Sequence, residues 1–343
     1  MIYVGLDVHQ GFSRVGVFNP ATGELADLGK MSNEPSQVAA QLARIAGPKT
    51  VVLEAGRSSH HMAALLEPLA EEVWMVDPGA VRKLQRRVAK TDRRDAAALA
   101  YWAAKGALQP LWRPDAQTLD LRELTRGKTG LTRLVVRVRV MIRALLARHG
   151  YECPYRDLLG LKAQAWLGEV QLPDYAGLML TTLRELLPLL QARAQQFEAL
   201  VEQEAPAYDP ARRLMTIPGI GPFLGLSLAA EIGEARRFPT ANHLRGYSGL
   251  TPRVHQSGEK ESRGPLTKRG NRWLRYAAVL AAQRMAAMRQ ADPRLKRTFL
   301  SVAFRHGHNP GKVACARRLL DLIHHLLCKG EDYRPPAARG VKV

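Results

Sequence analysis

The chain has 343 residues, 46% of them hydrophobic, which is enough for two or three domains with buried cores and excludes a wholly disordered chain. Its formal net charge of +20 predicts a polyanionic partner, with nucleic acid first among the candidates and a merely basic protein as the alternative. No apolar run reaches the roughly 18 residues of a membrane span. The three cysteines show no C-x-x-C spacing, which argues against a zinc site and a disulfide framework and fits a reducing, cytoplasmic compartment.

The first part of the chain, residues 1–110, alternates between short strands and helices. Strands are predicted over residues 2–8, 13–18 and 24–31, then a helix over 35–46, a strand over 50–53, a helix over 61–70 and a strand over 73–76. Because the first segment is strand-like and contains Asp7, no signal peptide is expected. The order β-β-β-α-β-α-β-α is that of a ribonuclease-H-like domain, so an α/β fold is predicted here.

Four carboxylates stand out in this domain. Asp7 lies inside the apolar strand V-G-L-D-V-H, and Glu54 ends the strand V-V-L-E-A-G. Asp92 and Asp95 lie three residues apart in K-T-D-R-R-D, so they share one face of a helix. An acid in an apolar strand is destabilising unless its charge is matched, and Mg²⁺ is the cation that oxygen ligands suit. The pattern therefore predicts a magnesium site built from these four residues.

Each carboxylate also has a simpler interpretation. Asp92 can be a helix N-cap with Asp95 in the first turn, Asp7 can cap a turn, and Glu54 can pair with Arg57. Sugar-kinase and actin-like ATPases also begin with a strand that carries an aspartate. They place a Gly/Thr-rich phosphate loop after it, whereas Val8, His9 and Gln10 follow here, which disfavours that class.

The middle of the chain, residues 111–210, favours a long helical hairpin or short coiled coil. Two long helices are predicted over residues 115–149 and 175–205, with a less regular segment between them. The second helix repeats apolar residues at intervals of seven, at Leu183, Leu190 and Phe197. The first is strongly basic, and its arginines include Arg133 and Arg137, which we expect to contact nucleic acid.

The last third, residues 211–330, is predicted to be mainly helical, with helices over 271–289 and 312–327 and a flexible tail over 331–343. It opens on M-T-I-P-G-I-G-P, where Gly219 and Gly221 before an apolar helix resemble a helix-hairpin-helix element. Glycines allow close backbone approach, and the amides at the start of a helix can hold a phosphate. A plain turn between two helices is the alternative.

Positive charge flanks both candidate sites. Arg86, Arg87 and Lys90 precede Asp92, as a nuclease requires if a polyanion is to lie over a negative metal site. Residues 251–343 carry 20 Lys/Arg against 6 Asp/Glu, with Lys268, Arg269 and Arg272 among them. A solvated helix face is the alternative interpretation of such runs.

Taken together, these motifs resemble the IS110 family of insertion-sequence transposases and the related pilin-gene invertases. The resemblance covers most of the chain up to about Lys329 and rests on the order and spacing of short motifs. They are V-G-L-D-V-H, V-V-L-E-A-G, K-T-D-R-R-D-A-A-A-L-A, I-P-G-I-G-P, F-P-T-A-N-H-L-R-G-Y-S-G-L-T-P, H-Q-S-G-E-K and L-T-K-R-G-N-R-W-L-R.

The resemblance implies more than the residues do. It assigns Asp7, Glu54, Asp92 and Asp95 to the metal-binding DEDD set of a RuvC-like domain, and Ser257 to the nucleophile of a C-terminal transposase domain. It also implies donor and target DNA duplexes, a structured guide (bridge) RNA and a homo-oligomer, either a dimer or a tetramer. Without the resemblance, Ser257 is an ordinary turn serine, and Ser248 is its nearest rival.

The working hypothesis is a DNA recombinase in which Ser257 attacks a phosphodiester beside the bound magnesium and forms a covalent phosphoserine, with the two parts of the site supplied by different domains. A second hypothesis is a metal-dependent junction resolvase or nuclease in which water attacks and the serine is incidental. A third is a non-catalytic nucleic-acid-binding protein.

Overall fold

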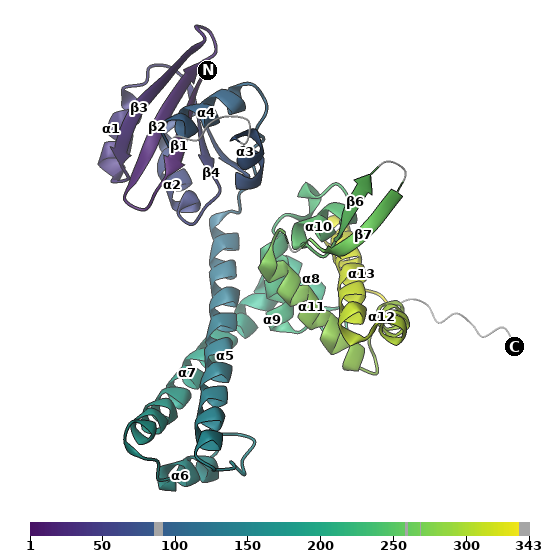
Figure 1. Ribbon diagram of the computed structural model, residues 1–343. Helices are drawn as coiled ribbons and strands as arrows, with labels where there is room; N and C mark the ends of the chain where they lie inside the picture. The colour runs from purple at the N-terminus through teal and green to yellow at the C-terminus, as the bar shows by residue number, and fades with distance from the viewer. Residues whose placement is uncertain (86–91, 258–259, 268, 336–343) are drawn as a thin grey trace, which may run out of the picture. The chain divides into compact units, whose positions relative to one another are not determined.

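The computed structural model describes residues 1–85, 92–257, 260–267 and 269–335. The chain forms two compact units, Met1–Arg113 and Pro114–Val343. Figure 1 shows the strands of the first unit and the long helices of the second. Arg86, Arg87, Lys90 and Lys268, four of the residues predicted to bind nucleic acid, lie outside the described residues. No helix among the described residues has both the length and the apolar character that crossing a membrane requires.

The first unit is built around a five-stranded sheet with the order β3-β2-β1-β4-β5. The strands β1 (Ile2–Val8), β2 (Phe12–Asn19) and β3 (Glu24–Ser32) pair antiparallel, whereas β4 (Lys49–Glu54) and β5 (Glu72–Val76) continue the sheet in parallel with β1. The predicted strands are all present. The mixed sheet therefore follows from the apolar runs and turns of the sequence.

Helices cover both faces of this sheet. On one face, α1 (Pro35–Ala43) and α2 (Ser59–Leu66), which the short helix η1 (Glu67–Leu69) extends, enclose a core that includes Val4, Leu6 and Leu53. On the other face lie α3 (Pro78–Gln85) and α4 (Asp92–Ala104), over a smaller core around Val52 and Leu99. Since side chains alternate along a strand, each residue of β1 and β4 belongs to one of these two faces.

Two glycines set the position of α4. A Cβ at Gly5 in β1 would lie 1.9 Å from the carbonyl oxygen of Ala96, and one at Gly16 in β2 would lie 2.2 Å from the nitrogen of Ala97. No residue with a side chain fits at either place. The absence of side chains brings the helix that carries Asp95 into backbone contact with the strand that carries Asp7.

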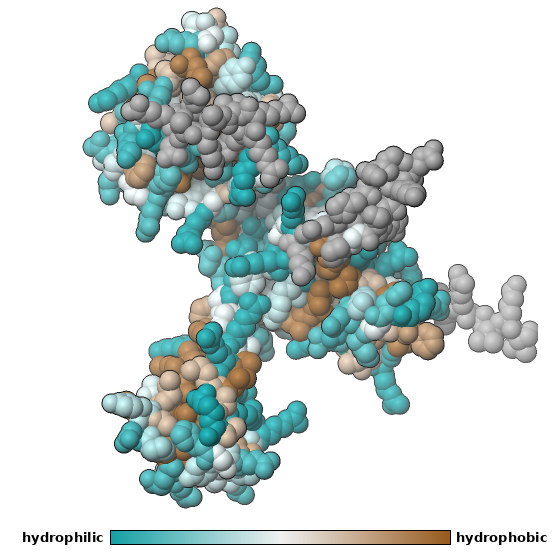
Figure 2. Space-filling view, viewed as in Figure 1, coloured by the Kyte–Doolittle hydropathy of each residue, from teal (hydrophilic) through white to brown (hydrophobic). Residues whose placement is uncertain are grey.

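The second unit begins with a helical hairpin. Helix α5 (Ala116–Arg148) and helix α7 (Asp174–Ala207) have 33 and 34 residues and pack side by side (Figure 1). Their shared core includes Ile142, Leu146 and Leu187. The segment between them, expected to be irregular, contains α6 (Leu161–Glu169). Several large apolar side chains stay exposed on the hairpin, namely Leu134, Val136, Val140, Leu178 and Leu189. Figure 2 shows brown patches near the α6 end of the hairpin.

The rest of the second unit is a helical bundle with one small hairpin of strands. It contains α8 (Asp209–Met215), α9 (Pro222–Ile232), the short η2 (Ala235–Arg237), α10 (Ala241–Ser248), α11 (Arg272–Ala287), α12 (Pro293–His306) and α13 (His308–Lys329). Strands β6 (Pro252–Ser257) and β7 (Lys260–Leu266) pair antiparallel between α10 and α11. Sequence reasoning missed α12 and the hairpin. In the predicted tail, the Tyr333 hydroxyl donates to Asp292 at 2.7 Å.

Candidate active site

The carboxyl ends of β1 and β4 bring two of the predicted metal ligands together. These strands run parallel, and their last recorded pair is Leu6 with Leu53, so Asp7 and Glu54 follow directly on neighbouring strands. Leu6 and Leu53 belong to the core under α1 and α2. Because side chains alternate, Asp7 and Glu54 lie on the opposite face, under α4. Loops at the carboxyl ends of parallel strands are the usual location of ligand sites in open α/β sheets.

Asp95 lies close to this pair. It occupies the first turn of α4, one residue before the Ala96 carbonyl that approaches Gly5. Burial raises the pKa of the Glu54 carboxyl above its ordinary value, and the negative charges of Asp7, Asp95 and Asp77 raise that pKa further. The positive charge of Arg82 lowers it. Three of the four predicted carboxylates are therefore near enough to influence one another electrostatically.

Asp92 starts α4 three residues before Asp95, but its side chain lies outside the described residues. Among the side chains that the structure does describe, no group of three or more Asp, Glu, His or Cys is arranged to hold a metal ion. The donor chemistry nevertheless suits a hard divalent cation, since the carboxylates of Asp7, Glu54 and Asp95 offer oxygen ligands only. A cation beside them would also offset the repulsion that raises the pKa of Glu54.

A pocket of about 400 Å³ opens beside Asp7 and Glu54 and is lined mainly by the loops that follow β1 and β4. In it, the Nε2 atom of His9 lies 3.1 Å from Oδ2 of Asp7, and the His9 ring stacks on Phe12 with centroids 4.7 Å apart. Sequence reasoning noticed His9 only as a mismatch to a phosphate loop. Its signal was its position two residues after Asp7, which puts both side chains on one side of an extended chain.

Ser257 lies in the second unit, at the end of β6. It pairs with Lys260 of β7, and this is the last recorded pair before residues 258 and 259, which are not described. The side chain of Ser257 is outside the described residues as well. The rival Ser248 is fully buried, and its hydroxyl donates to the Arg245 carbonyl at 2.7 Å. A buried, hydrogen-bonded hydroxyl is poorly placed to reach DNA, which favours Ser257 of the two.

The base of the β6–β7 hairpin is fixed by a close backbone contact. Gly249 has φ of +69°, and a Cβ there would lie 2.2 Å from the carbonyl oxygen of Arg269. The Asn271 nitrogen donates to the Tyr247 carbonyl at 2.7 Å, and the Thr267 nitrogen donates to the Thr251 carbonyl at 2.9 Å. The segments before and after the hairpin are thus held against each other.

A buried acid that sequence reasoning missed supports this base. Glu231 of α9 is 1% exposed and accepts hydrogen bonds from Arg126 of α5 at 2.7 and 2.9 Å and from the Asn271 amide at 2.7 Å. The Asn271 oxygen in turn caps α11 by accepting from the nitrogens of Trp273 and Leu274. The available signal was a single acid in the apolar run L-S-L-A-A-E-I-G, which requires a buried cationic partner.

The other predicted contact residues are spread over the second unit. Arg133, Arg137, Arg269 and Arg272 are exposed. Gly219 has φ of +93° in the turn between α8 and α9, and Gly221 is the N-cap of α9, an arrangement that both the predicted helix-hairpin-helix element and its alternative, a plain turn, require. Phosphate binding at that turn stays a prediction.

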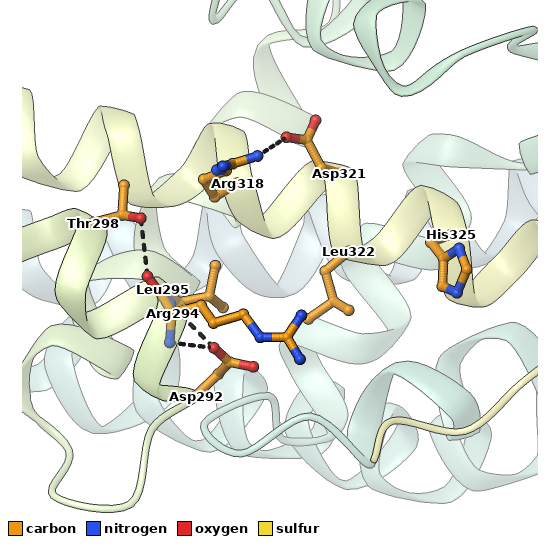
Figure 3. A pocket seen from close by; sticks show the side chains of 8 residues that line it. All are labelled: Asp292, Arg294, Leu295, Thr298, Arg318, Asp321, Leu322 and His325. Carbon is orange, nitrogen blue, oxygen red and sulfur yellow. Dashed lines mark hydrogen bonds and ion pairs between the residues drawn. The ribbon is translucent and has the colours of Figure 1, made fainter. Parts of the chain in front are cut away.

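A larger pocket, of about 440 Å³, lies between α12 and α13 and contains none of the predicted site residues (Figure 3). Its acids already have partners. Asp292 caps α12 by accepting from the nitrogens of Arg294 and Leu295 at 2.7 and 3.1 Å, and Asp321 pairs with Arg318 at 3.6 Å (Figure 3). Two candidate sites therefore remain, the carboxylates of the first unit and the β6–β7 hairpin of the second.

Two family models match the chain at these two places. A model of DEDD transposases of the IS110 type matches residues 4–150, and a model described as "Transposase IS116/IS110/IS902 family" matches residues 211–300. Together they contain Asp7, Glu54, Asp92, Asp95 and Ser257. The first carries the acidic cluster, and the second carries the hairpin.

Similar proteins extend along most of the chain. A "Probable family 20 transposase" of Pseudomonas aeruginosa is 26% identical over 294 residues, which cover 84% of this chain and 86% of the relative. The transposase for insertion sequence element IS1111A of Coxiella burnetii is 26% identical over 83% of this chain and 79% of its own length. The transposase for insertion sequence element IS1328 of Yersinia enterocolitica is 27% identical over 78% of this chain and 80% of its own length.

The acidic sheet edge, the helical second unit and these matches define an insertion-sequence transposase, an enzyme class that cuts and rejoins DNA. Within that class, the chain belongs to the IS110/IS116/IS902 family, and the resemblance found in the sequence motifs is confirmed.

Proposed function

We propose that this transposase cleaves and exchanges DNA strands through a covalent phosphoserine intermediate at Ser257, with Mg²⁺ bound at Asp7, Glu54, Asp92 and Asp95. The observation that carries the metal part is that Asp7 and Glu54 lie together at the carboxyl ends of two neighbouring strands, where burial, and then the charges of Asp7 and Asp95, raise the pKa of Glu54. The pocket beside them leaves room for a phosphodiester.

The proposed class of the first unit is ribonuclease-H-like, of the RuvC-like kind. Three antiparallel strands followed by two parallel ones, in the order β3-β2-β1-β4-β5, support this class. The same topology explains why acids that are distant in the sequence gather, because β1 and β4 are neighbours in the sheet and α4 packs on β1 and β2 at Gly5 and Gly16.

In this proposal Asp7, Glu54, Asp92 and Asp95 hold the cation. Bound magnesium would polarise the phosphodiester and stabilise charge on the attacking and leaving oxygens. The residues themselves position the metal, and the half-buried Glu54 keeps part of the site away from bulk water. Arg82, whose charge reaches Glu54, adds positive charge at the same edge of the sheet.

Ser257 supplies the nucleophile. Its Oγ bonds to phosphorus as the P–O3′ bond breaks, the serine proton is released to a base or to solvent, and the departing oxygen becomes a 3′-hydroxyl. In the second half, the 3′-hydroxyl of a new partner strand attacks the phosphoserine, and Oγ takes up a proton as it leaves. One phosphoester bond replaces another in each half, so no ATP is needed.

The proposed partners are two DNA duplexes, donor and target, and a structured guide RNA. The charge of +14 carried by residues 251–343 and the exposed Arg133 and Arg137 of α5 support contacts with nucleic-acid phosphates. We also propose a dimer or tetramer. The exposed apolar side chains of the α5–α7 hairpin, such as Val136 and Leu189, support a protein contact there.

The test is to trap the intermediate. Wild-type protein is incubated with element-end DNA, MgCl₂ and the RNA transcribed from the element, then denatured and resolved by gel electrophoresis. We expect a denaturation-resistant protein–DNA complex in the wild type and none in Ser257→Ala, although Ser257→Ala still binds the DNA. Asp7→Asn is also expected to lose the complex, while the buried Ser248→Ala keeps it.

Other outcomes favour the alternatives. Strand exchange by Ser257→Ala at the wild-type rate would exclude the serine route. Magnesium-dependent cleavage without any covalent complex would indicate a junction resolvase in which water attacks. A protein that binds DNA but shows no difference between wild type and Asp7→Asn would be a non-catalytic binding protein.

A further inference from the structure

Three arginines surround one tryptophan on the surface of the second unit. The guanidinium groups of Arg272, Arg133 and Arg126 lie 5.2, 5.4 and 5.8 Å from the centre of the Trp273 ring. Arg133 also lies 4.8 Å from the centre of the Tyr276 ring. Trp273 and Tyr276 are three residues apart on α11, so they share one face of that helix.

The facing side of α5 is open. Arg126 and Arg133 lie seven residues, or two helical turns, apart on it, and Gly130 falls between them on the same side. A Cβ at Gly130 would meet no atom within 4 Å. Trp273 and Tyr276 are both partly exposed, so part of each ring is accessible from solvent.

The arginines of this cluster differ in whether their charge is paired. Arg126 is held by Glu231 through hydrogen bonds of 2.7 and 2.9 Å, so its charge is neutralised and its position is fixed. Arg133 and Arg272 are exposed and form no ion pair within the part of the chain that the structure describes. Arg126 therefore contacts Trp273 from a fixed position, while Arg133 and Arg272 keep their charge for another partner.

We propose that Trp273 and Tyr276, with Arg133 and Arg272, form a platform that stacks an unpaired nucleobase of a single nucleic-acid strand. Aromatic rings stack on bases of any sequence, and adjacent arginines contact the phosphates on either side of the stacked base. A base inside a duplex is already covered on both faces, so the platform selects unpaired strands over double-stranded DNA.

This inference rests on the proposed function only in taking nucleic acid as the partner; it does not depend on cleavage. Unpaired strands of two kinds share the required chemistry, the loop of a structured RNA and a DNA strand released during exchange. Comparing RNA with DNA of the same sequence distinguishes them.

The experiment uses the full chain with Ser257→Ala, in EDTA, so that no chemistry takes place. A 12-nucleotide RNA carrying one 5-iodouridine, the matching single-stranded DNA and a blunt duplex are each bound and irradiated. We expect cross-links from the single strands to a peptide that contains Trp273 and Tyr276, and none from the duplex. Trp273→Ala should weaken single-strand binding by roughly 5- to 150-fold, and Trp273→Phe should retain most of it.

Two controls match the residues removed. Tyr175→Ala deletes an aromatic ring that is 88% exposed on α7, and Arg193→Ala deletes an exposed charge on the same helix. Both should bind like the parent protein. If Trp273→Ala does not fold, Arg133→Gln, which alters an exposed residue only, should still weaken single-strand binding several-fold more than Arg193→Ala. Equal binding by Trp273→Ala and Tyr175→Ala, or equal cross-linking of the duplex, would overturn the platform.

The two proposals can fail separately. If the serine route is wrong, the covalent complex is absent from the active protein while the cross-link at Trp273 persists. If the platform is wrong, the covalent complex forms normally and the cross-link falls elsewhere.

Discussion

The amide group of Asn271 donates to the buried carboxylate of Glu231 at 2.7 Å, while the oxygen of the same side chain caps α11. Glu231 also binds Arg126 of α5. One acid therefore joins the long hairpin, the buried helix α9 and the start of α11. The β6–β7 hairpin ends only five residues before Asn271, at Leu266, so its base depends on this junction.

Removing the charge of Glu231 should destabilise the second unit strongly. In Glu231→Gln the guanidinium of Arg126 and the nearby Arg122 lose their counter-charge in a buried site, and breaking such a pair costs roughly 3–5 kcal/mol. The measurement is chemical denaturation followed by circular dichroism. The matched control is Glu198→Gln, which breaks a pair with Lys128 at 2.7 Å in which the Glu198 side chain is 43% exposed, and it should change stability by about 1 kcal/mol or less. Similar values for the two variants would contradict a structural role for Glu231.

The raised pKa of Glu54 predicts a dependence of stability on pH. A carboxyl whose folded pKa lies above its ordinary 4.5 prefers to be protonated in the folded state, so its ionisation opposes folding as the pH rises above 4.5. In metal-free buffer, Glu54→Gln should therefore be more stable than wild type at pH 7, and this difference should vanish by about pH 4. Thermal unfolding across that range tests the sign. A Glu54→Gln variant that is less stable at pH 7 would contradict it.

Bound magnesium should make wild type more stable than Glu54→Gln at pH 7. Ligand binding to the folded state stabilises it, so MgCl₂ should raise the melting temperature of wild type relative to EDTA and leave Glu54→Gln almost unchanged. Glu71→Gln removes an exposed acid beside β5 and should respond like wild type. If MgCl₂ affects all three proteins equally, the carboxylates are not its site.

The contact between α4 and the sheet should not tolerate a side chain. In Gly16→Ala the new Cβ would lie 2.2 Å from the backbone of Ala97, so α4 must move away, at about 1–3 kcal/mol or more. Asp95 would move with it, and the stabilisation by MgCl₂ should fall as well. Gly11→Ala places a Cβ in open space and serves as the control. The loss of stability and the response to MgCl₂ are both measured in the same thermal melts. A Gly16→Ala protein that MgCl₂ stabilises as much as wild type would contradict the expected link between the position of α4 and the metal site.

The backbone contact between Gly249 and Arg269 should influence the reaction at Ser257, because it fixes the base of the β6–β7 hairpin. Alanine at φ of +69° is strained, and its Cβ would meet the Arg269 carbonyl at 2.2 Å. We expect Gly249→Ala to lose about 2 kcal/mol or more of stability and to form less of the covalent complex. Gly246→Ala, in the preceding helix turn with open space around it, should be neutral or slightly stabilising. Normal formation of the covalent complex by Gly249→Ala would show that the hairpin does not depend on the contact between Gly249 and Arg269.

Much of the first unit was predictable because its signals are local. The apolar run around Asp7 and the turn at residues 19–23 determine strands, and parallel neighbours follow from the helices between them. Glu54 was found because an acid ends a buried strand. The predicted four-carboxylate site already required the helix of Asp92 and Asp95 to lie near the strands, but the backbone contacts at Gly5 and Gly16 were not foreseen, because a glycine in a strand gives no information about which helix will cover it.

The second unit was less predictable. Its long helices follow from heptad-like spacing, but that spacing does not decide the burial of neighbouring residues, since Leu186 is 37% exposed while Leu187 is buried. Helix α12 was missed, although Asp292 followed by Pro293 is a start signal. The β6–β7 pair lacks an apolar alternation that would announce strands. Partners of Glu231 come from 105 and 40 residues away, beyond the reach of any local pattern.

Helix α5 joins two packed regions of the second unit without a break. Thirty-three residues at about 1.5 Å each give an unbroken rod of roughly 50 Å. One stretch of it packs with α7, and another holds Glu231 through Arg126. Packed interiors transmit displacement with little compression. A displacement applied at the α6 end of this helix would therefore be carried through Arg126 and Glu231 to Asn271, next to the base of the β6–β7 hairpin.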